Sequence, residues 1–285
     1  MKKFYIMPNH LKDADLKVAA LVREELYRCD PGVEVTVEET IEERSSGRID
    51  AKTECIIVLG GDGTIIRAAN DTVGLGIPLI GINLGTLGYL TEIERDNIPA
   101  AMRQLVSDDY HIEERMMLAG VVDCAGMGTE AAGKEAVSAL NDVVLTRRGD
   151  FQIIGYRVFV NGKHLNDFYA DGMILSTPTG SSGYNLSAGG SIVEPRARLI
   201  VLTPVCPHTM SSRSIILSPE DTVGIEVLPP RGEKPVEVEA CFDGMGQGIL
   251  HPGDRVTAFR SPQVTKMIKL SDVGFLEALH KRLSV

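Results

Sequence analysis

Residues 55–59 form an unbroken apolar run, and the glycine-rich turn Gly60-Gly61-Asp62-Gly63-Thr64 follows it directly. A run of this kind is typical of a strand that is buried on both faces of a parallel sheet. Residues 65–73 then place apolar side chains at helical spacing. The turn therefore joins a buried strand to a helix, and the sequence predicts an α/β fold around it.

Strands and helices alternate through about residue 118, which predicts an α/β domain with a parallel sheet over residues 1–118. Its other strands are expected at 4–7, 33–37 and 77–82, and its other helices at 13–27 and 98–106.

Beyond residue 118 the pattern is β-rich, which predicts a second domain over residues 119–265. A tail over 266–285 follows, and its residues 272–283 have the spacing of an amphipathic helix. The strands of the second domain are expected at 118–122, 142–146, 153–160, 173–176, 199–202, 223–228 and 236–242.

Composition excludes several classes of function. The 29 basic and 39 acidic residues leave a net charge of −10, which disfavours nucleic acid and anionic membrane surfaces as partners. No apolar stretch is long enough to cross a bilayer, and residues 4–7 are too few for the core of a signal peptide. The five cysteines are widely spaced and odd in number, so a reducing cytoplasm is expected. The histidines are isolated, and no protein-held metal ion is predicted.

The turn at residues 60–64 has the character of a phosphate site. Backbone N–H groups at the start of a helix bind anions, and glycines leave Asp62 as the only ionisable side chain of the turn. A carboxylate there either caps the helix or contacts Mg²⁺ or a hydroxyl group that is about to be phosphorylated. The second reading means phosphoryl transfer. No Lys-Ser or Lys-Thr follows the glycines, which excludes a P-loop NTPase.

A second stretch, residues 171–190, combines hydroxyl groups, amides and glycines after a predicted strand. Such a surface suits a polyhydroxyl ligand that carries phosphates, although composition alone also fits a flexible loop. Gly180-Ser181-Ser182-Gly183 misses the Gly-x-Ser-x-Gly spacing of a serine hydrolase by one residue, which argues against hydrolysis by a serine.

These two stretches together resemble the NAD kinase family, which combines a Gly-Gly-Asp-Gly-Thr turn with a Thr-Pro-Thr-Gly-Ser segment. The resemblance runs through most of the chain. Further matches are Gly81-Ile82-Asn83, Leu87-Gly88-Tyr89-Leu90, Asn141-Asp142, Ser187-Ala188-Gly189-Gly190, Thr203-Pro204, Pro207-His208-Thr209, Arg213 and Asp243-Gly244.

The resemblance implies phosphoryl transfer from ATP, or from polyphosphate, to the 2′-hydroxyl group of the adenosine ribose of NAD, giving NADP. Asp62 would be the catalytic residue, and Mg²⁺ would accompany the phosphates of ATP. The implied fold places a β-sandwich-like, dinucleotide-binding second domain after the α/β domain, with the C-terminal helix packing back on the first. The implied binding residues are Gly61, Gly63, Thr64, Tyr89, Leu90, Asn141, Asp142, Asp171, Thr179, Ser182, Gly183, Tyr184 and Ser187.

The resemblance also implies a role for several of these side chains. Asn141 would bind the adenine end, Asp142 the ribose hydroxyl groups, and Tyr184 would lie against the dinucleotide. Members of the family are homo-oligomers, so a homodimer or homotetramer is expected, with Asp171 contributed in trans. Ser182 and Ser187 would line the rest of the site.

The sequence departs from the family pattern at three places. Asp142 stands where Glu is usual, Ser182-Gly183 where Thr-Ala is usual, and Ser214 where Pro is usual. Asp is one methylene shorter than Glu, so its ribose contact is expected to be longer or bridged by water.

Three alternatives to an NAD kinase stay open at this point. One is a lipid or sugar kinase that shares the first turn. Another is a dehydrogenase, for which residues 126–131 fit Gly-x-Gly-x-x-Ala, although the β-α-β context that this motif requires is missing. The third is a dinucleotide sensor without catalytic activity on the same scaffold.

Overall fold

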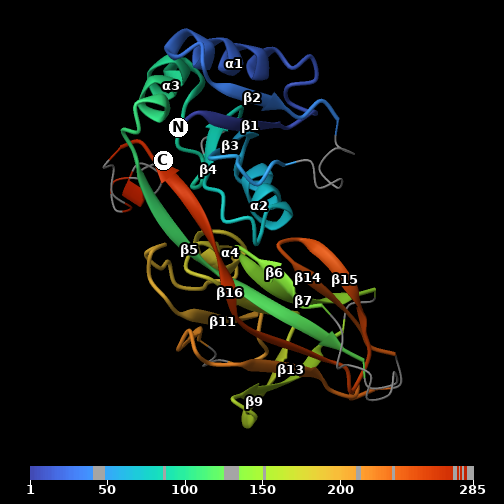
Figure 1. Cartoon of the computed structure of the whole chain (residues 1–285). Coiled ribbons are helices and arrows are strands. Elements are labelled where there is room, and N and C mark those ends of the chain that lie inside the picture. Colours follow the sequence, from blue (N-terminus) through green and yellow to red (C-terminus); the bar gives the residue numbers. More distant parts are fainter. Residues whose placement is uncertain are drawn as a thin grey trace. The chain divides into compact units, whose positions relative to one another are not determined.

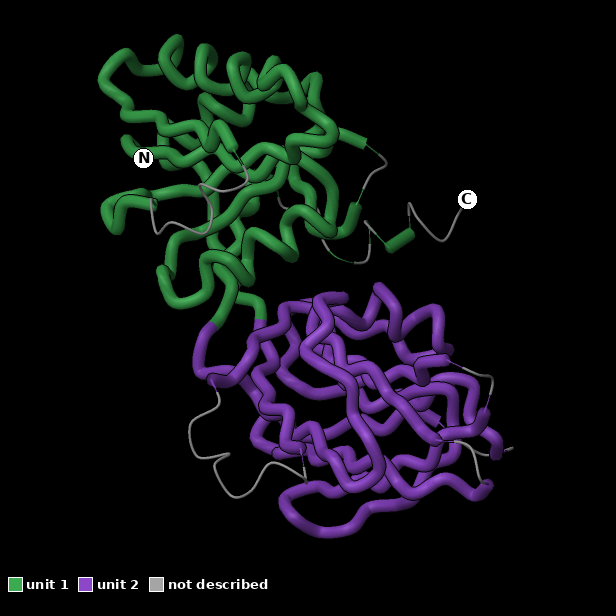
Figure 2. Tube along the Cα trace, turned by 90° about the vertical axis from the view of Figure 1, so that its right-hand side faces the viewer, with its two compact units in different colours: residues 1–115, 264–285 green, residues 116–263 purple. Residues whose placement is uncertain are grey.

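The computed structural model describes residues 1–40, 49–85, 88–124, 135–149, 152–209, 213–232, 235–271, 275, 277, 279 and 280. The chain divides into two compact units, coloured separately in Figure 2. Unit 1 consists of Met1–Arg115 and Val264–Val285, and unit 2 of Met116–Gln263.

Unit 1 is built on a parallel sheet with the strand order β2-β1-β3-β4. All six residues of β3 are buried, which agrees with the unbroken apolar run that predicted it. Met267 of the long strand β16 (Arg255–Lys269) pairs in parallel with Leu79, so the C-terminal segment returns to unit 1. The other strands are β1 (Lys3–Pro8), β2 (Glu34–Val37), β3 (Cys55–Gly60) and β4 (Leu79–Asn83).

Helices cover both faces of this parallel sheet. Helices α1 (Lys17–Cys29) and α3 (Ile98–Val106) pack against each other and share one apolar cluster with alternate residues of β1 and β3 (Figure 1). Helix α2 (Asp62–Asp71) packs on β3, and its Ile65 lies against Gly81 of β4. A short 3₁₀ helix, η2 (Arg95–Asn97), precedes α3.

Unit 2 is a sandwich of two sheets that are largely antiparallel. One sheet has the order β12-β11-β10-β7-β14-β15, and the other contains β6, β5, β16, β13, β8 and β9. The strands are β5 (His111–Asp123), β6 (Val137–Ala139), β7 (Asp142–Arg148), β8 (Ile154–Val160), β9 (Lys163–Ala170), β10 (Gly172–Ser176), β11 (Ile200–Val205), β12 (Ile215–Leu217), β13 (Val223–Val227), β14 (Glu237–Phe242) and β15 (Met245–Leu250).

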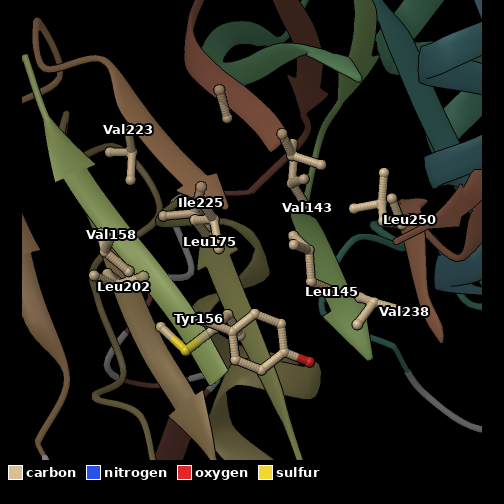
Figure 3. Packing of buried hydrophobic residues seen from close by; sticks show 14 of the residues in the cluster. Val143, Leu145, Tyr156, Val158, Leu175, Leu202, Val223, Ile225, Val238 and Leu250 are labelled. Carbon is tan, nitrogen blue, oxygen red and sulfur yellow. The ribbon is translucent and has the colours of Figure 1, made fainter. Parts of the chain in front are cut away.

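The core of unit 2 lies between its two sheets. Val143 and Leu145 of β7 belong to the same buried cluster as Tyr156 and Val158 of β8 and Ile225 of β13 (Figure 3). The residues between these inward-facing positions point away from the core, as the two-residue period of a strand requires. Together the two units confirm the predicted fold class, an α/β part followed by a β-rich, sandwich-like part.

Several elements differ from the sequence expectations. Strands β9 and β15 were not predicted, because at least half of the residues in each are exposed and polar residues or glycines interrupt their apolar residues. Helix α2 begins at Asp62 rather than at residue 65. The predicted helix over 272–283 and the Gly-x-Gly-x-x-Ala segment over 126–131 fall mostly or wholly outside the described residues. Among the helices that are described, none is long and apolar enough to span a membrane.

Candidate active site

Two backbone N–H groups hold the carboxylate of Asp62. The N–H of Tyr89 donates to Oδ2 at 2.6 Å, and the N–H of Leu90 donates to Oδ1 at 3.0 Å. Asp62 is half-buried at the first residue of α2, immediately after β3. Each carboxylate oxygen can accept more than one hydrogen bond, so both oxygens keep acceptor capacity for a ligand. The structure thus brings Asp62, Tyr89 and Leu90 together, as three of the predicted site residues.

Close backbone packing surrounds the Asp62 carboxylate. A Cβ atom at Gly88 would lie 1.7 Å from Asp62 Oδ1, so only glycine fits there. A Cβ atom at Gly60 would lie 2.3 Å from Thr64 Oγ1. That hydroxyl accepts a hydrogen bond from Asn9 Nδ2 at 3.0 Å, which ties the loop after β1 to the turn after β3. Thr64 therefore supports the turn.

The predicted glycines of the turn lie at the start of α2. Gly61 is the N-cap residue of α2 and has an extended backbone conformation. Gly63 is exposed, and a Cβ atom there would have nothing within 4 Å. The open space above Gly63 leaves the first turn of α2 accessible to a ligand.

In unit 2, Asp243 holds the backbone that carries Asn141 and Asp142. The Asp243 carboxylate accepts the N–H groups of Leu140 at 2.6 Å, Asn141 at 2.8 Å and Asp142 at 3.0 Å. In return, the N–H of Asp243 donates to the carbonyl oxygen of Asp142 at 2.9 Å. Asp243 itself has a φ of 49°, in the left-handed region that Asp tolerates better than most residues. The predicted pair Asn141-Asp142 thus lies on a fixed turn.

The segment after β10 packs directly on Asn141. The N–H of Thr177 donates to the Asn141 carbonyl oxygen at 2.8 Å, and a Cβ atom at Gly180 would lie 2.2 Å from the same oxygen. A Cβ atom at Gly183 would lie 3.6 Å from Asn141 Nδ2. Asn141, Thr179 and Gly183, all predicted from the sequence, are therefore gathered at one end of β7 and β10.

Two polar atoms of this group are buried without a hydrogen-bond partner. Within the described ranges, neither Asn141 Oδ1 nor Thr179 Oγ1 has one. A buried polar atom without a partner costs roughly 1–3 kcal/mol, so such atoms usually serve a ligand or a water molecule. Their position in the predicted binding segment favours a ligand with polar edges, such as a nucleotide.

The short helix α4 (Tyr184–Ser187) carries the next predicted residues. The Tyr184 side chain is 45% exposed, and Ser187 is also exposed. Ser182 Oγ donates to the Thr179 carbonyl oxygen at 3.4 Å, a long hydrogen bond that leaves the hydroxyl easy to redirect. Asn185 lies between Tyr184 and Ser187 and is fully buried. Its Nδ2 donates to the Ser181 carbonyl oxygen and its Oδ1 accepts the Thr203 hydroxyl group, so it anchors the helix.

Asp171 lies apart from the other predicted residues of unit 2. It precedes β10, whereas Thr179 and Gly183 follow it. Five strand residues span roughly 17 Å, so the two ends of β10 cannot line one small pocket. Arg147 Nε lies 3.4 Å from Asp171 Oδ1. Asp171 is thus separated from Asn141 within one chain.

Burial raises the pKa of Asp142 to about 7, and the negative charge of Asp243 adds to this effect. Asp142 is 7% exposed, so its charged form is poorly solvated. Near neutral pH its carboxyl group is therefore partly protonated and can donate a hydrogen bond as well as accept one.

Sequence reasoning missed some residues that shape the site. Asn9 and Lys12 follow β1 and have no motif around them, and only the parallel sheet places them beside the turn at residue 60. Gly88 and Asp243 were noted as parts of matching segments but not as site residues. The sequence did contain a signal for each of them. Gly88, before Tyr89 and Leu90, indicates close packing, and Asp243, before Gly244, indicates a turn.

No group of three or more His, Cys, Asp or Glu side chains that could hold a metal ion occurs among the residues that the structure describes. Asp62 alone offers carboxylate oxygens at the glycine-rich turn. The residues present therefore fit a cation that arrives with a phosphate ligand rather than one held by the protein alone.

A carboxylate fixed at the carboxyl edge of a parallel sheet, in a glycine-rich turn at the start of a helix, is the arrangement of a phosphotransferase site. The profile of the ATP-NAD kinase N-terminal domain matches residues 5–110, and that of the ATP-NAD kinase C-terminal domain matches residues 140–270. This chain belongs to the ATP-NAD kinase family.

Individual relatives agree with this assignment. The NAD kinases of Lachnoclostridium phytofermentans and Agathobacter rectalis are each 41% identical to this chain, over 99% of this chain and 99% of their own length. The structure is similar to yeast NADH kinase complexed with NADH, with a TM-score of 0.88 and 24% identity over 100% of this chain and 88% of that chain.

A second similar structure is an NAD kinase from Archaeoglobus fulgidus in complex with ATP. Its TM-score is 0.75 at 23% identity, over 99% of both chains. At such identities the two structures show that the fold is shared.

The packing at Gly88 predicts a specific loss of activity. In Gly88→Ala the new methyl group would overlap Asp62 Oδ1 and displace the carboxylate. We expect NADP formation to fall roughly 10- to 100-fold, the effect of a displacement of about 1 Å at a reacting group. The control is Gly232→Ala, because a Cβ atom there meets nothing within 4 Å. Equal initial rates for the two variants would contradict this account of Gly88.

The raised pKa of Asp142 predicts a pH-dependent gain of stability in Asp142→Asn. The unfolded chain loses this proton near pH 4 and the folded chain near pH 7, so ionisation destabilises the folded state increasingly over that interval. The variant escapes this penalty. We expect its advantage in the free energy of unfolding to grow from pH 4 to 7 and to reach roughly 2–4 kcal/mol. Urea denaturation at pH 5 and pH 8 measures it, and an equal difference at both pH values would refute the assignment.

Proposed function

We propose that this chain phosphorylates the 2′-hydroxyl group of the adenosine ribose of NAD with ATP and produces NADP. The observation that carries the proposal is the Asp62 carboxylate, fixed by the N–H groups of Tyr89 and Leu90 in a turn without bulky side chains. Membership of the ATP-NAD kinase family supports the substrates. A lipid or sugar kinase, or a sensor, would leave NAD unphosphorylated in the assay described below.

Asp62 would act by orienting the acceptor hydroxyl group. A carboxylate is a weak base, but phosphoryl transfer through a loose transition state requires little proton removal early in the reaction. Orientation then suffices, and the proton passes to the carboxylate late in the transfer. The two backbone N–H donors favour this role, because they fix the direction of both oxygens before the substrate binds.

Polar atoms of unit 2 would bind the nucleotide part of NAD. Asn141 Oδ1 can accept a hydrogen bond from the amino group of adenine, and Thr179 Oγ1 can donate to or accept from the same ligand. Asp142 would bond ribose hydroxyl groups, and its partly protonated state lets it serve as donor or acceptor. The exposed ring of Tyr184 offers a flat apolar surface for the dinucleotide.

We propose Mg²⁺, or another divalent cation, as a cofactor that binds together with ATP. The cation would contact donor phosphates and an Asp62 oxygen, and its charge would offset the charge that develops on the transferred group. Donor choice between ATP and polyphosphate and acceptor choice between NAD and NADH are tested by the same assay with each compound.

A cytoplasmic location is proposed as well. All five cysteines are free, with Cys29, Cys55, Cys124 and Cys241 at least partly buried, which fits a reducing compartment.

We further propose that the protein is a homodimer or homotetramer in which Asp171 completes the site of a neighbouring copy. Its separation from Asn141 and Thr179 along β10 supports this arrangement, because Asp171 cannot reach the group formed by these residues in its own chain.

Replacement of Asp62 tests the catalytic proposal. Asp62→Asn keeps the size of the side chain but removes its charge and its capacity to take a proton. We expect turnover to fall roughly 10²- to 10⁴-fold while NAD still binds. Turnover is followed with Mg-ATP, NAD and an NADP-specific coupling enzyme, and binding by calorimetry. A rate equal to that of the wild type would rule out this role for Asp62.

Co-expression of two inactive variants tests the shared site. If Asp171 acts in trans, a mixed oligomer of Asp62→Asn and Asp171→Asn chains contains one kind of site in which both carboxylates are intact. In a purified mixed dimer one of the two sites would then be intact, so about half of the wild-type activity should return. Differently tagged chains allow the mixed species to be purified and assayed. If it stays as inactive as its parents, Asp171 serves its own chain or another purpose.

A further inference from the structure

Lys12 places its ammonium group beside the glycine-rich turn. Its Nζ lies 3.6 Å from the position that a Cβ atom would take at Gly61 and 2.8 Å from that position at Gly85. Gly61 follows β3 and Gly85 follows β4, so the ammonium group is near two loops at the carboxyl edge of the sheet. A side chain at either glycine would cover it.

The loop that carries Lys12 is anchored on both sides. Asn9 donates to Thr64 Oγ1, and its carbonyl oxygen accepts the N–H of Lys12 at 2.8 Å. The buried carboxylate of Asp13 accepts the N–H groups of Val18 and Ala19, both at 3.0 Å, at the start of α1. The backbone thus directs Lys12 to the turn.

Lys12 is exposed, and it forms no ion pair or hydrogen bond through its side chain with any residue in the described ranges. By contrast, Lys17, five residues further along the chain, is paired with Asp15 at 2.8 Å. An ammonium group close to two glycines, without a carboxylate partner, is suited to an anion that approaches the backbone closely.

The charged groups around Lys12 indicate where a phosphate group of a substrate would bind. A cavity of about 430 Å³ adjoins Gly85 and is lined in part by Glu94, Arg95 and Asp96. Its two carboxylates outnumber the guanidinium group of Arg95, which disfavours phosphate groups inside the cavity, so phosphate would lie on the Lys12 side of Gly85. Asp62, in the same turn, adds negative charge that a cation must offset if a phosphoryl group is to approach.

We propose that Lys12 binds the terminal phosphates of the donor, ATP, and holds them beside Asp62. This inference rests on the proposed function, because Asp62 is taken to orient the acceptor hydroxyl group. The phosphates of NAD extend from the 5′ carbon, away from the 2′ side of the ribose, so the donor is the phosphate that reaches the turn. Lys12 would contribute a point charge and up to three hydrogen-bond donors to it.

Steady-state kinetics of Lys12→Ala and Lys12→Arg test the assignment, with Lys17→Ala as the control. We expect Lys12→Ala to lower kcat/KM for ATP about 10- to 100-fold, the effect of losing a charge-assisted hydrogen bond. The KM for NAD should change less than about twofold, and Lys12→Arg should recover part of the loss because it keeps the charge. A loss no larger than in Lys17→Ala, or one confined to the KM for NAD, would overturn the inference.

Chemical protection separates this inference from the proposed function. Wild-type protein is acylated with an N-hydroxysuccinimide ester with or without Mg-ATP or NAD, and modification of Lys12 and Lys17 is read by mass spectrometry. We expect Mg-ATP, but not NAD, to slow acylation of Lys12 several-fold and to leave Lys17 unchanged. Protection without NADP formation would refute the proposed function alone. NADP formation without protection by Mg-ATP would refute the role of Lys12.

Discussion

The two hydrogen bonds from the Tyr89 and Leu90 N–H groups to the Asp62 carboxylate determine how the rest of unit 1 must be built. They require the segment after β4 to approach the start of α2 closely, which the absence of a side chain at Gly88 permits. They also require β3 and β4 to be parallel neighbours, so that both strands end at the same edge. The buried apolar run of β3 secures that arrangement through the hydrophobic effect.

Unit 2 also contains a carboxylate that accepts backbone N–H groups, that of Asp243, but its role is structural. The Asp243 carboxylate accepts hydrogen bonds from three backbone N–H groups, and these bonds hold the turn at Asn141 and Asp142 in place. The consequence for Asp142 is electrostatic, because burial and the nearby charge of Asp243 raise its pKa to about 7. Asp142 is shorter than the Glu that is usual in the family at this position. Because its carboxyl group is partly protonated near neutral pH, it can also donate a hydrogen bond.

Much of the fold could be predicted because its signals are local. The apolar run of β3 and the helical spacing of α3 each depend on a few neighbouring residues. Strand β15 could not be predicted, because an exposed edge strand carries little apolar pattern.

The site shows the same division. Asp62 and Asn141 lie in recognisable motifs, and the sequence alone indicated them. Lys12 belongs to no motif, and its proximity to Gly61 and Gly85 arises only when three parallel strands end side by side. The burial that leaves Asn141 Oδ1 without a partner is equally a property of packing, since it depends on the segment after β10.

In the proposed mechanism, the Asp62 carboxylate forms a hydrogen bond with the 2′-hydroxyl group of the substrate ribose and orients it. The most direct measurement is a crystal structure of the complex with NAD, in which the distance between an Asp62 carboxylate oxygen and the ribose 2′ oxygen is determined. The account predicts a hydrogen-bond distance of about 2.6–3.2 Å. A carboxylate that faces away from the ribose, with no polar atom of the sugar within about 4 Å and no contact to a phosphate-bound cation, would contradict it.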